Sequence, residues 1–249
     1  MKKLEGKTIL ITGGTQGIGL ETAKHAQAQG ANVIITGTNQ DRLDAAAQEL
    51  GPKVLAVRAD VRNNTDLDTL FATICDRFQH IDVLFANAGA GTASPLEAVT
   101  AEQIDNQFAI NFKGIFFTVQ KAVPLMRKGG SIVLNTSFLN EVGAPGLSIL
   151  SATKAAVRSL ARSLGAELAP RGIRVNAVSP GPISTGFHSK LGLTDAQLSA
   201  AAAGLEARVP MHRFGEPSEI AKVVTFLASS DSSYMTGTET VVDGGLSQL

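Results

Sequence analysis

A glycine-rich turn near the start of the chain has residue types and spacing suited to binding phosphate. It reads Thr12-Gly13-Gly14-Thr15-Gln16-Gly17-Ile18-Gly19, after an apolar run at 8–11 and before an amphipathic stretch at 20–29. Such a turn lets backbone approach a pyrophosphate and directs free N–H groups of the helix start toward it. Glycine is needed because a Cβ would block that approach or prevent a positive φ. The spacing alone is a weak signal, but between a strand and a helix it predicts a dinucleotide site formed by Gly13, Thr15, Gln16, Gly17, Ile18 and Gly19.

The residues after the second predicted strand bear on the type of dinucleotide. A carboxylate there would bind a ribose 2′-hydroxyl and repel a 2′-phosphate, and none is present beside Thr38 and Asn39. This absence favours NADP(H) over NAD(H), with Thr38 and Asn39 as hydrogen-bond donors. No arginine is expected nearby, and Gln16 rather than a cation occupies the glycine turn. A simpler interpretation is that Thr38 and Asn39 cap the following helix.

Other strand ends supply the remaining candidates, because ligands of open α/β sheets bind beyond the carboxyl ends of the strands. Asp60 could contact an adenine or cap a helix, and Thr185 could bind a nicotinamide carboxamide or be an ordinary loop hydroxyl. The further residues expected to contact the coenzyme are Val61, Asn87, Ala88, Gly89, Pro180, Gly181 and Ile183.

A sheet must position these residues, and the apolar patterning predicts one. Short runs that are apolar at odd and even positions, typical of strands covered on both faces, occur at 8–12, 32–36, 54–58, 83–86, 131–135, 174–179 and 239–242. Helical patterns lie between them at 17–29, 41–50, 64–78, 101–126, 150–169 and 217–228. Regular alternation with right-handed crossovers predicts an α/β fold, a doubly wound parallel sheet of about seven strands flanked by helices on both faces.

The organisation along the chain is simple. No repeat, low-complexity tract or linker interrupts the pattern, so residues 1–249 are expected to form a single domain. The least regular segment runs from 180 to 210. Long irregular segments in compact domains usually bind ligands, so 183–210 is interpreted as a substrate-binding loop.

Composition excludes several classes of function. The net charge is zero and no Lys/Arg cluster appears, so a nucleic-acid partner is not expected. The chain shows no signal peptide and no apolar run of membrane-spanning length, so a cytoplasmic protein without a membrane partner is expected. His25, His80 and His212 lack the spacing of metal ligands, and no metal is expected. The single cysteine, Cys75, lies in an apolar helical pattern and is expected to pack as a small hydrophobe.

Taken together, the motifs resemble the short-chain dehydrogenase/reductase family over essentially the whole chain. The resemblance rests on the glycine turn, Asn87-Ala88-Gly89, Asn111, Ser137, Lys154, Pro180-Gly181 and the tail Val242-Asp243-Gly244-Gly245, in this order and spacing. It implies a seven-stranded Rossmann-type fold, a nicotinamide coenzyme and a homotetramer. It also implies that Ser137 polarises a substrate carbonyl, that Lys154 holds the nicotinamide ribose, and that Asn111 anchors a proton-relay water.

The tyrosine that transfers the proton in that family is missing. Leu150 occupies its position, four residues before Lys154 and thirteen after Ser137. Leucine cannot donate a proton, and the loss of a positioned acid typically costs about 10²–10⁴-fold in rate. The only tyrosine, Tyr234, precedes the last strand and is not expected to substitute for it. Surrogate donors could be His188, Asn140 or Glu141, although each is more simply interpreted as a surface-loop residue.

Three functions remain open on these grounds. The first is an NADP(H)-dependent oxidoreductase of apolar ketones or alcohols, in which Leu150 is engineered or is compensated elsewhere. The second is a reductase of imines or activated alkenes that needs no enzymic acid. The third is a non-catalytic nucleotide-binding protein. An apolar substrate pocket is suggested by Phe138, Leu139, Leu147 and Ile149, although core packing explains the last two equally well.

Overall fold

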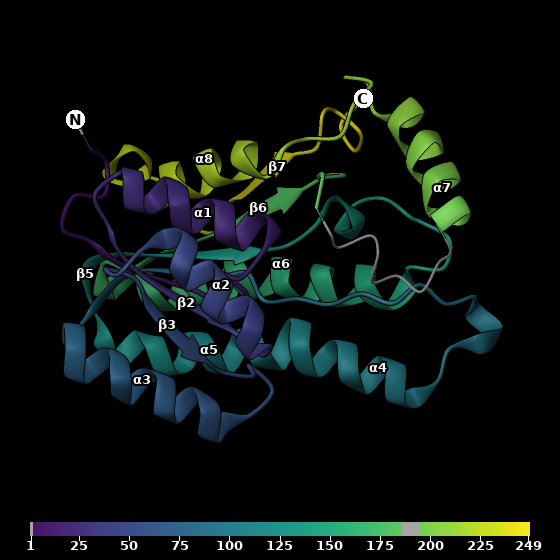
Figure 1. Cartoon of the computed structure of the whole chain (residues 1–249). Helices are drawn as coiled ribbons and strands as arrows, with labels where there is room; N and C mark the ends of the chain where they lie inside the picture. The colour runs from purple at the N-terminus through teal and green to yellow at the C-terminus, as the bar shows by residue number, and fades with distance from the viewer. Residues whose placement is uncertain (1, 186–194) are drawn as a thin grey trace.

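The structure, a computed structural model, describes residues 2–185 and 195–249, and seven parallel strands within these residues form one sheet (Figure 1). The strand order is β3-β2-β1-β4-β5-β6-β7. The chain therefore adds β2 and β3 on one side of β1, and then returns to place β4 on the other side of β1. The strands are β1 (Thr8–Ile11), β2 (Asn32–Gly37), β3 (Leu55–Arg58), β4 (Ile81–Ala86), β5 (Met126–Asn135), β6 (Arg174–Pro180) and β7 (Glu239–Val242).

Helices cover both faces of the sheet, which confirms the predicted doubly wound α/β fold (Figure 1). Alternate residues of each strand enter opposite cores: Leu10 and Leu84 pack on one side with α3, α5 and α6, while Ile9 and Ile11 pack on the other with α1, α2 and α8. The helices are α1 (Gly17–Ala28), α2 (Gln40–Leu50), α3 (Asn64–Phe78), α4 (Ala101–Phe108), α5 (Ile115–Ala122), α6 (Ser148–Leu168), α7 (Asp195–Arg208) and α8 (Pro217–Ala228).

The helix expected at 101–126 is interrupted. A π-helical turn, η2 (Ala109–Gly114), separates α4 from α5, and β5 already begins at Met126. The buried side chain of Asn111 lies in this turn, where its Oδ1 accepts the N–H of Ala90 and its Nδ2 donates to the Ala90 carbonyl, each at 2.8 Å. The same Nδ2 donates to Thr153 Oγ1 at 3.0 Å. These long-range hydrogen bonds stabilise the irregular turn. The apolar periodicity of the sequence does not predict them.

Two other expectations are wrong. The segment 183–210 is not irregular throughout, because α7 occupies Asp195–Arg208; its alanine-rich sequence lacks the apolar stripe by which helices are recognised. Cys75 is exposed rather than packed. It follows the buried Ile74 on α3, and one residue is about 100° of rotation around a helix, so its side chain leaves the core face. No helix among the described residues combines the length and apolarity that crossing a bilayer requires.

The last strand depends on a buried amide. Asn176 on β6 donates from Nδ2 to the Met235 carbonyl at 2.8 Å, and its Oδ1 accepts from the N–H and the hydroxyl of Thr238 at 3.1 and 2.9 Å. We expect Asn176→Ala to lower the free energy of unfolding in urea by about 3 kcal/mol or more, because each stranded polar group costs about 1–3 kcal/mol.

A suitable control is Thr69→Ala, since the exposed Thr69 hydroxyl bonds only within its own helix. That variant should lose less than about 0.5 kcal/mol. Equal losses in the two variants would contradict the stated role of Asn176.

Candidate active site

A crevice of about 880 Å³ opens at the carboxyl ends of the strands. It lies where the strand order reverses between β1 and β4, the position at which open α/β sheets bind ligands. Of the residues predicted for catalysis or coenzyme binding, only Asn111 does not line it, and Ile149, suggested for the substrate pocket, does not line it either. The predicted residues brought together there are Gly13, Thr15, Gln16, Gly17, Ile18, Gly19, Thr38, Asn39, Asp60, Val61, Asn87, Ala88, Gly89, Ser137, Leu150, Lys154, Pro180, Gly181, Ile183 and Thr185.

The start of α1 lines this crevice. Gln16, the residue before the helix, makes no side-chain cap, and the first turn of α1 contains no acidic residue. By contrast, Asn39 caps α2 by accepting the N–H of Arg42 at 2.9 Å. An uncapped helix start carries a partial positive charge and free donors, which suit a phosphate group.

Two glycines serve different purposes in the turn. Gly13 has a φ of +66°, which side chains rarely allow. A Cβ on Gly19 would lie 2.3 Å from the Gly13 carbonyl oxygen and 2.7 Å from Asn87 Nδ2. Gly19 is therefore required for close packing of α1 on the turn rather than for direct approach of a ligand.

The end of the crevice beside β2 is more basic than expected. Arg42 lines it and donates from Nη1 to Gln16 Oε1 at 3.2 Å, while Arg58 donates from Nε to the Thr38 carbonyl at 3.1 Å. The expectation that no arginine stands nearby is therefore wrong. Arg42 does not directly follow β2 in the sequence, but the first turn of α2 brings its side chain back to the crevice. For Asn39, the interpretation as a helix cap is confirmed.

Asp60 occupies the same region but brings little net charge. Arg62 also lines the crevice, and its Nη2 lies 2.6 Å from an Asp60 carboxylate oxygen. The side-chain hydrogen bond from Arg62 lowers the pKa of Asp60. The carboxylate is thus ionised and paired, and the arginines leave this end of the crevice net positive.

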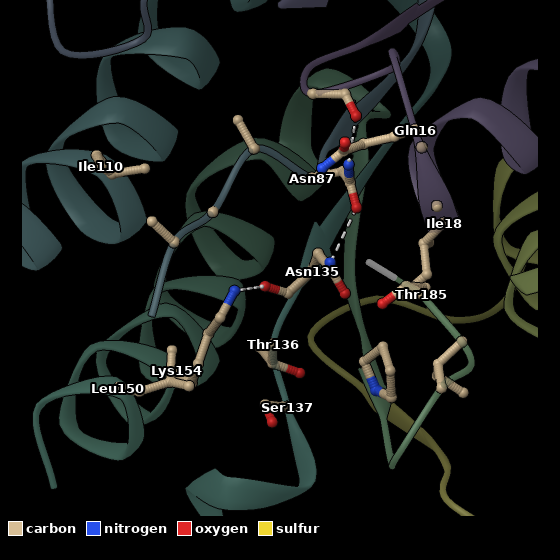
Figure 2. A pocket seen from close by; sticks show the side chains of 18 of the residues that line it. Gln16, Ile18, Asn87, Ile110, Asn135, Thr136, Ser137, Leu150, Lys154 and Thr185 are labelled. Atoms are coloured by element: carbon tan, nitrogen blue, oxygen red, sulfur yellow. Dashed lines mark hydrogen bonds between the residues drawn. The ribbon is translucent and has the colours of Figure 1, made fainter. Parts of the chain in front are cut away.

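At the opposite end, Lys154 and Leu150 extend from the start of α6 (Figure 2). The Lys154 side chain is buried, and its Nζ donates to the Asn135 carbonyl at 2.8 Å. Burial lowers the pKa of Lys154 from 10.5 to about 8. Leu150 is only 4% exposed and supplies no polar atom beside this amine.

Ser137 lies across from these residues at the end of β5 (Figure 2). It begins the short 3₁₀ helix η4 (Phe138–Asn140), and its Oγ accepts the N–H of Leu139 at 3.3 Å. The hydroxyl hydrogen is not used in that bond. Ser137 can therefore donate to an acceptor in the crevice.

Asn135 also lines the crevice, although it was not among the predicted site residues. Its Nδ2 donates to Asn87 Oδ1 at 3.0 Å (Figure 2), and its buried Oδ1 has no hydrogen-bond partner in the described part of the chain. The available signal was its place at a strand end, two residues before Ser137. Apolar lining residues outside the prediction include Ile110, Ala93, Pro145 and Phe214, whereas Ala202 and Leu205 fall within the predicted substrate-binding segment 183–210.

Several other candidates lie elsewhere. Asn140 and Glu141 do not line the crevice, Tyr234 is fully exposed, and His188 lies outside the described residues. Asn111 lies behind the crevice, and its role with a relay water stays a prediction. Within residues 2–185 and 195–249, no three His, Cys, Asp or Glu side chains gather as metal ligands do.

The fold and the crevice define a Rossmann-type α/β protein with a glycine-rich turn after the first strand, and comparison with known proteins gives its family. The family model described as enoyl-(acyl carrier protein) reductase matches residues 13–247. Oxidoreductase asL5 of Sarocladium schorii is 45% identical, over 100% of this chain and 99% of that protein. The 3-oxoacyl-[acyl-carrier-protein] reductase FabG of Thermotoga maritima is 38% identical, over 98% and 99%. A short-chain type dehydrogenase/reductase from Mycobacterium marinum superposes with a TM-score of 0.92 at 31% identity, covering 99% of this chain and 98% of the other.

The chain therefore belongs to the short-chain dehydrogenase/reductase family and is an enzyme of that type. The family is one of oxidoreductases that use NAD(P)(H).

The lowered pKa of Lys154 predicts how stability depends on pH. Between about pH 8 and 10.5 the unfolded chain binds more protons than the folded one, so stability rises with pH across this window. Lys154→Met abolishes this dependence. Measured by urea unfolding without coenzyme, the stability of the parent relative to the variant should rise by about 2–3 kcal/mol between pH 7 and 10.5. Parallel stability curves for the two proteins would contradict the assignment.

Proposed function

We propose that this enzyme is an NADP(H)-dependent oxidoreductase that interconverts an apolar ketone and its alcohol. The observation that carries the proposal is the meeting of Ser137 and Lys154 in one crevice with the uncapped start of α1. A hydroxyl donor and a cation positioned beside a dinucleotide site are suited to stabilising the oxygen of a carbonyl.

The residues present fit such a coenzyme. The glycine turn and the first N–H groups of α1 would hold the pyrophosphate, and Lys154 and Thr185 would hold the nicotinamide riboside. When bound, the reduced coenzyme supplies a hydride. The chain itself contributes the Ser137 hydroxyl, which donates to the substrate oxygen, and walls that exclude water.

Arg42 supports NADP(H) rather than NAD(H). Its guanidinium lines the crevice next to Thr38, and no ion pair in the described part of the chain joins it to a carboxylate. A guanidinium matches the geometry and charge of a phosphate, whereas a ribose hydroxyl gains little from it.

The substrate end of the crevice supports an apolar substrate. Phe138, Leu147, Leu150, Leu205 and Phe214 contribute to its wall. Segment 183–210 provides Leu205 through α7, in keeping with a role in substrate binding.

The source of the proton limits carbonyl reduction by this protein. Near neutral pH the Lys154 amine is largely protonated, because its pKa is about 8, but Leu150 places no hydroxyl between it and a substrate. The substrate oxygen would then take its proton from water or directly from Lys154. We expect slow turnover of ketones for this reason.

A second candidate function is reduction of an imine or an activated alkene. A protonated imine already carries its charge, and an activated alkene can take its proton from water, so neither needs a tyrosine. The description of the matching family model, an enoyl-(acyl carrier protein) reductase, favours the alkene variant of this candidate. The related 3-oxoacyl-[acyl-carrier-protein] reductase favours carbonyl reduction. A non-catalytic nucleotide-binding protein, the third alternative, has no observation in its favour.

Further features of the proposal concern the protein as a whole. We propose a single-domain chain that forms a homotetramer in the cytoplasm and takes a small molecule with apolar groups as its partner. The family resemblance supports the tetramer. Large apolar side chains exposed on one protomer are compatible with it, among them Leu96, Met211, Tyr234 and Leu249.

Replacing Arg42 tests the coenzyme preference. Arg42→Ala should raise the dissociation constant for NADPH by about 10–100-fold, because a charged hydrogen bond is worth about 1.5–3 kcal/mol. Binding of NADH should change less than twofold. Fluorescence titration measures both constants. The control is Arg127→Ala, an exposed residue at the amino end of β5, away from the crevice at the carboxyl ends of the strands. An equal effect of Arg42→Ala on both coenzymes would show that Arg42 does not read the phosphate.

Restoring a phenol tests the function itself. Leu150→Tyr should raise the rate of NADPH-dependent ketone reduction by about 10²–10⁴-fold, because Lys154 one helical turn away favours proton transfer by the phenol. Leu150→Phe provides the ring without the hydroxyl and serves as the control. The panel should contain ketones, imines and activated alkenes. Turnover of imines or alkenes alone by the parent protein would select the second candidate, and equal ketone rates for the Tyr and Phe variants would exclude the first.

A further inference from the structure

A buried carboxylate lies behind the crevice at the start of the last strand. The side chain of Glu239 is 6% exposed, and its Oε2 lies 2.8 Å from Nε of Arg158 on α6. Its Oε1 accepts hydrogen bonds from Thr136 Oγ1 and Asn140 Nδ2, each at 2.6 Å. Neither Glu239 nor Arg158 lines the crevice, so the pair does not contact a ligand there.

The two residues that bond to Glu239 flank Ser137. Thr136 directly precedes it at the end of β5 (Figure 2), and Asn140 ends the 3₁₀ helix that Ser137 begins. The N–H of Asn140 also donates to the Ser137 carbonyl at 3.0 Å. One carboxylate oxygen thus anchors both sides of the turn that carries the Ser137 hydroxyl.

The carboxylate of Glu239 determines the orientation of the Asn140 side-chain amide. Its Nδ2 faces Glu239, while its buried Oδ1 has no hydrogen-bond partner among residues 2–185 and 195–249. A carboxylate only accepts hydrogen bonds, so it selects the amide nitrogen and fixes the side chain. The stranded oxygen is a cost that the bond to Glu239 offsets.

Arg158 connects the same carboxylate to the helix that carries Lys154. It follows Lys154 by four residues on α6, and its Nη1 donates to the Gly237 carbonyl at 3.2 Å. Glu239 therefore links β7, the turn at Ser137 and α6. A buried ion pair adds little net stability compared with apolar side chains, so stability alone does not explain it.

We propose that Glu239 is a positioning residue that fixes the Ser137 hydroxyl relative to Lys154 through Thr136 and Asn140. The proposal rests on the proposed function of Ser137. Misplacement of a reacting group by about 1 Å can cost about 10²-fold in rate. Removal of the anchor should therefore lower kcat while leaving the coenzyme site intact.

Two double variants separate anchoring from ion pairing. Both replace Arg158 by Met, which avoids stranding a buried charge. Arg158→Met with Glu239→Met removes the acceptor, whereas Arg158→Met with Glu239→Gln keeps an amide oxygen that Thr136 and Asn140 can reach. A third variant, Asp82→Asn, removes a carboxylate that pairs with Lys7 at the amino ends of β1 and β4, the end of the strands opposite to the crevice.

The first readout is hydrogen exchange of the backbone amides at 139–142. We expect exchange at least tenfold faster in the Met/Met variant, recovery of most of the protection in the Met/Gln variant, and no change with Asp82→Asn. The second readout is kinetic: kcat for any substrate that the parent reduces should fall at least tenfold in Met/Met, with the dissociation constant for NADPH within twofold.

Failure of the positioning role of Glu239 can be distinguished from failure of the proposed function. Equal exchange in the two double variants would overturn the proposal, as would faster exchange with an unchanged kcat. If the parent reduces no substrate, the proposed function fails, and the exchange comparison still decides whether Glu239 fixes the turn.

Discussion

Asn87 joins the carboxyl ends of three strands, and the geometry of the crevice depends on this connection. Its backbone N–H donates to Thr12 Oγ1 at 3.0 Å, its Nδ2 donates to the Thr12 and Gly13 carbonyls, and its Oδ1 accepts from Asn135. The residue thus holds the ends of β1, β4 and β5 together at the point where the strand order reverses. These bonds tie the glycine turn to the segment that leads to Ser137.

The electrostatics of the crevice follow from its two ends. At one end, Arg42 and Arg58 add positive charge beside the uncapped start of α1, while Asp60 is neutralised by Arg62. At the other end, burial disfavours the charged form of Lys154 and brings its pKa to about 8. The crevice therefore suits an anionic nucleotide lying along the strand ends, with an amine of near-neutral pKa at the reacting end.

Leu150 gives that end of the crevice an aliphatic wall. The amine of Lys154 and the hydroxyl of Ser137 line the same crevice as this side chain. The two polar groups can stabilise charge on an oxygen atom, whereas Leu150 has no proton to donate. The link from Glu239 to Thr136 and Asn140 indicates that the position of Ser137 is nonetheless closely fixed.

Most of the fold could be predicted from the sequence, because local apolar periodicity identifies the strands and helices. The glycine spacing likewise identifies the turn after the first strand. Nearly all the predicted coenzyme-site residues line the crevice, since strand ends gather at one edge of a parallel sheet. The π-turn at Asn111, the approach of Arg42 to Gln16 and the bonds of Glu239 to the Ser137 turn were decided only by tertiary structure. Each of these features depends on contacts between side chains of elements that are far apart in the sequence. The local apolar pattern of the sequence does not predict such contacts. Helix α7 was missed for a different reason, because an alanine-rich helix shows no periodic stripe.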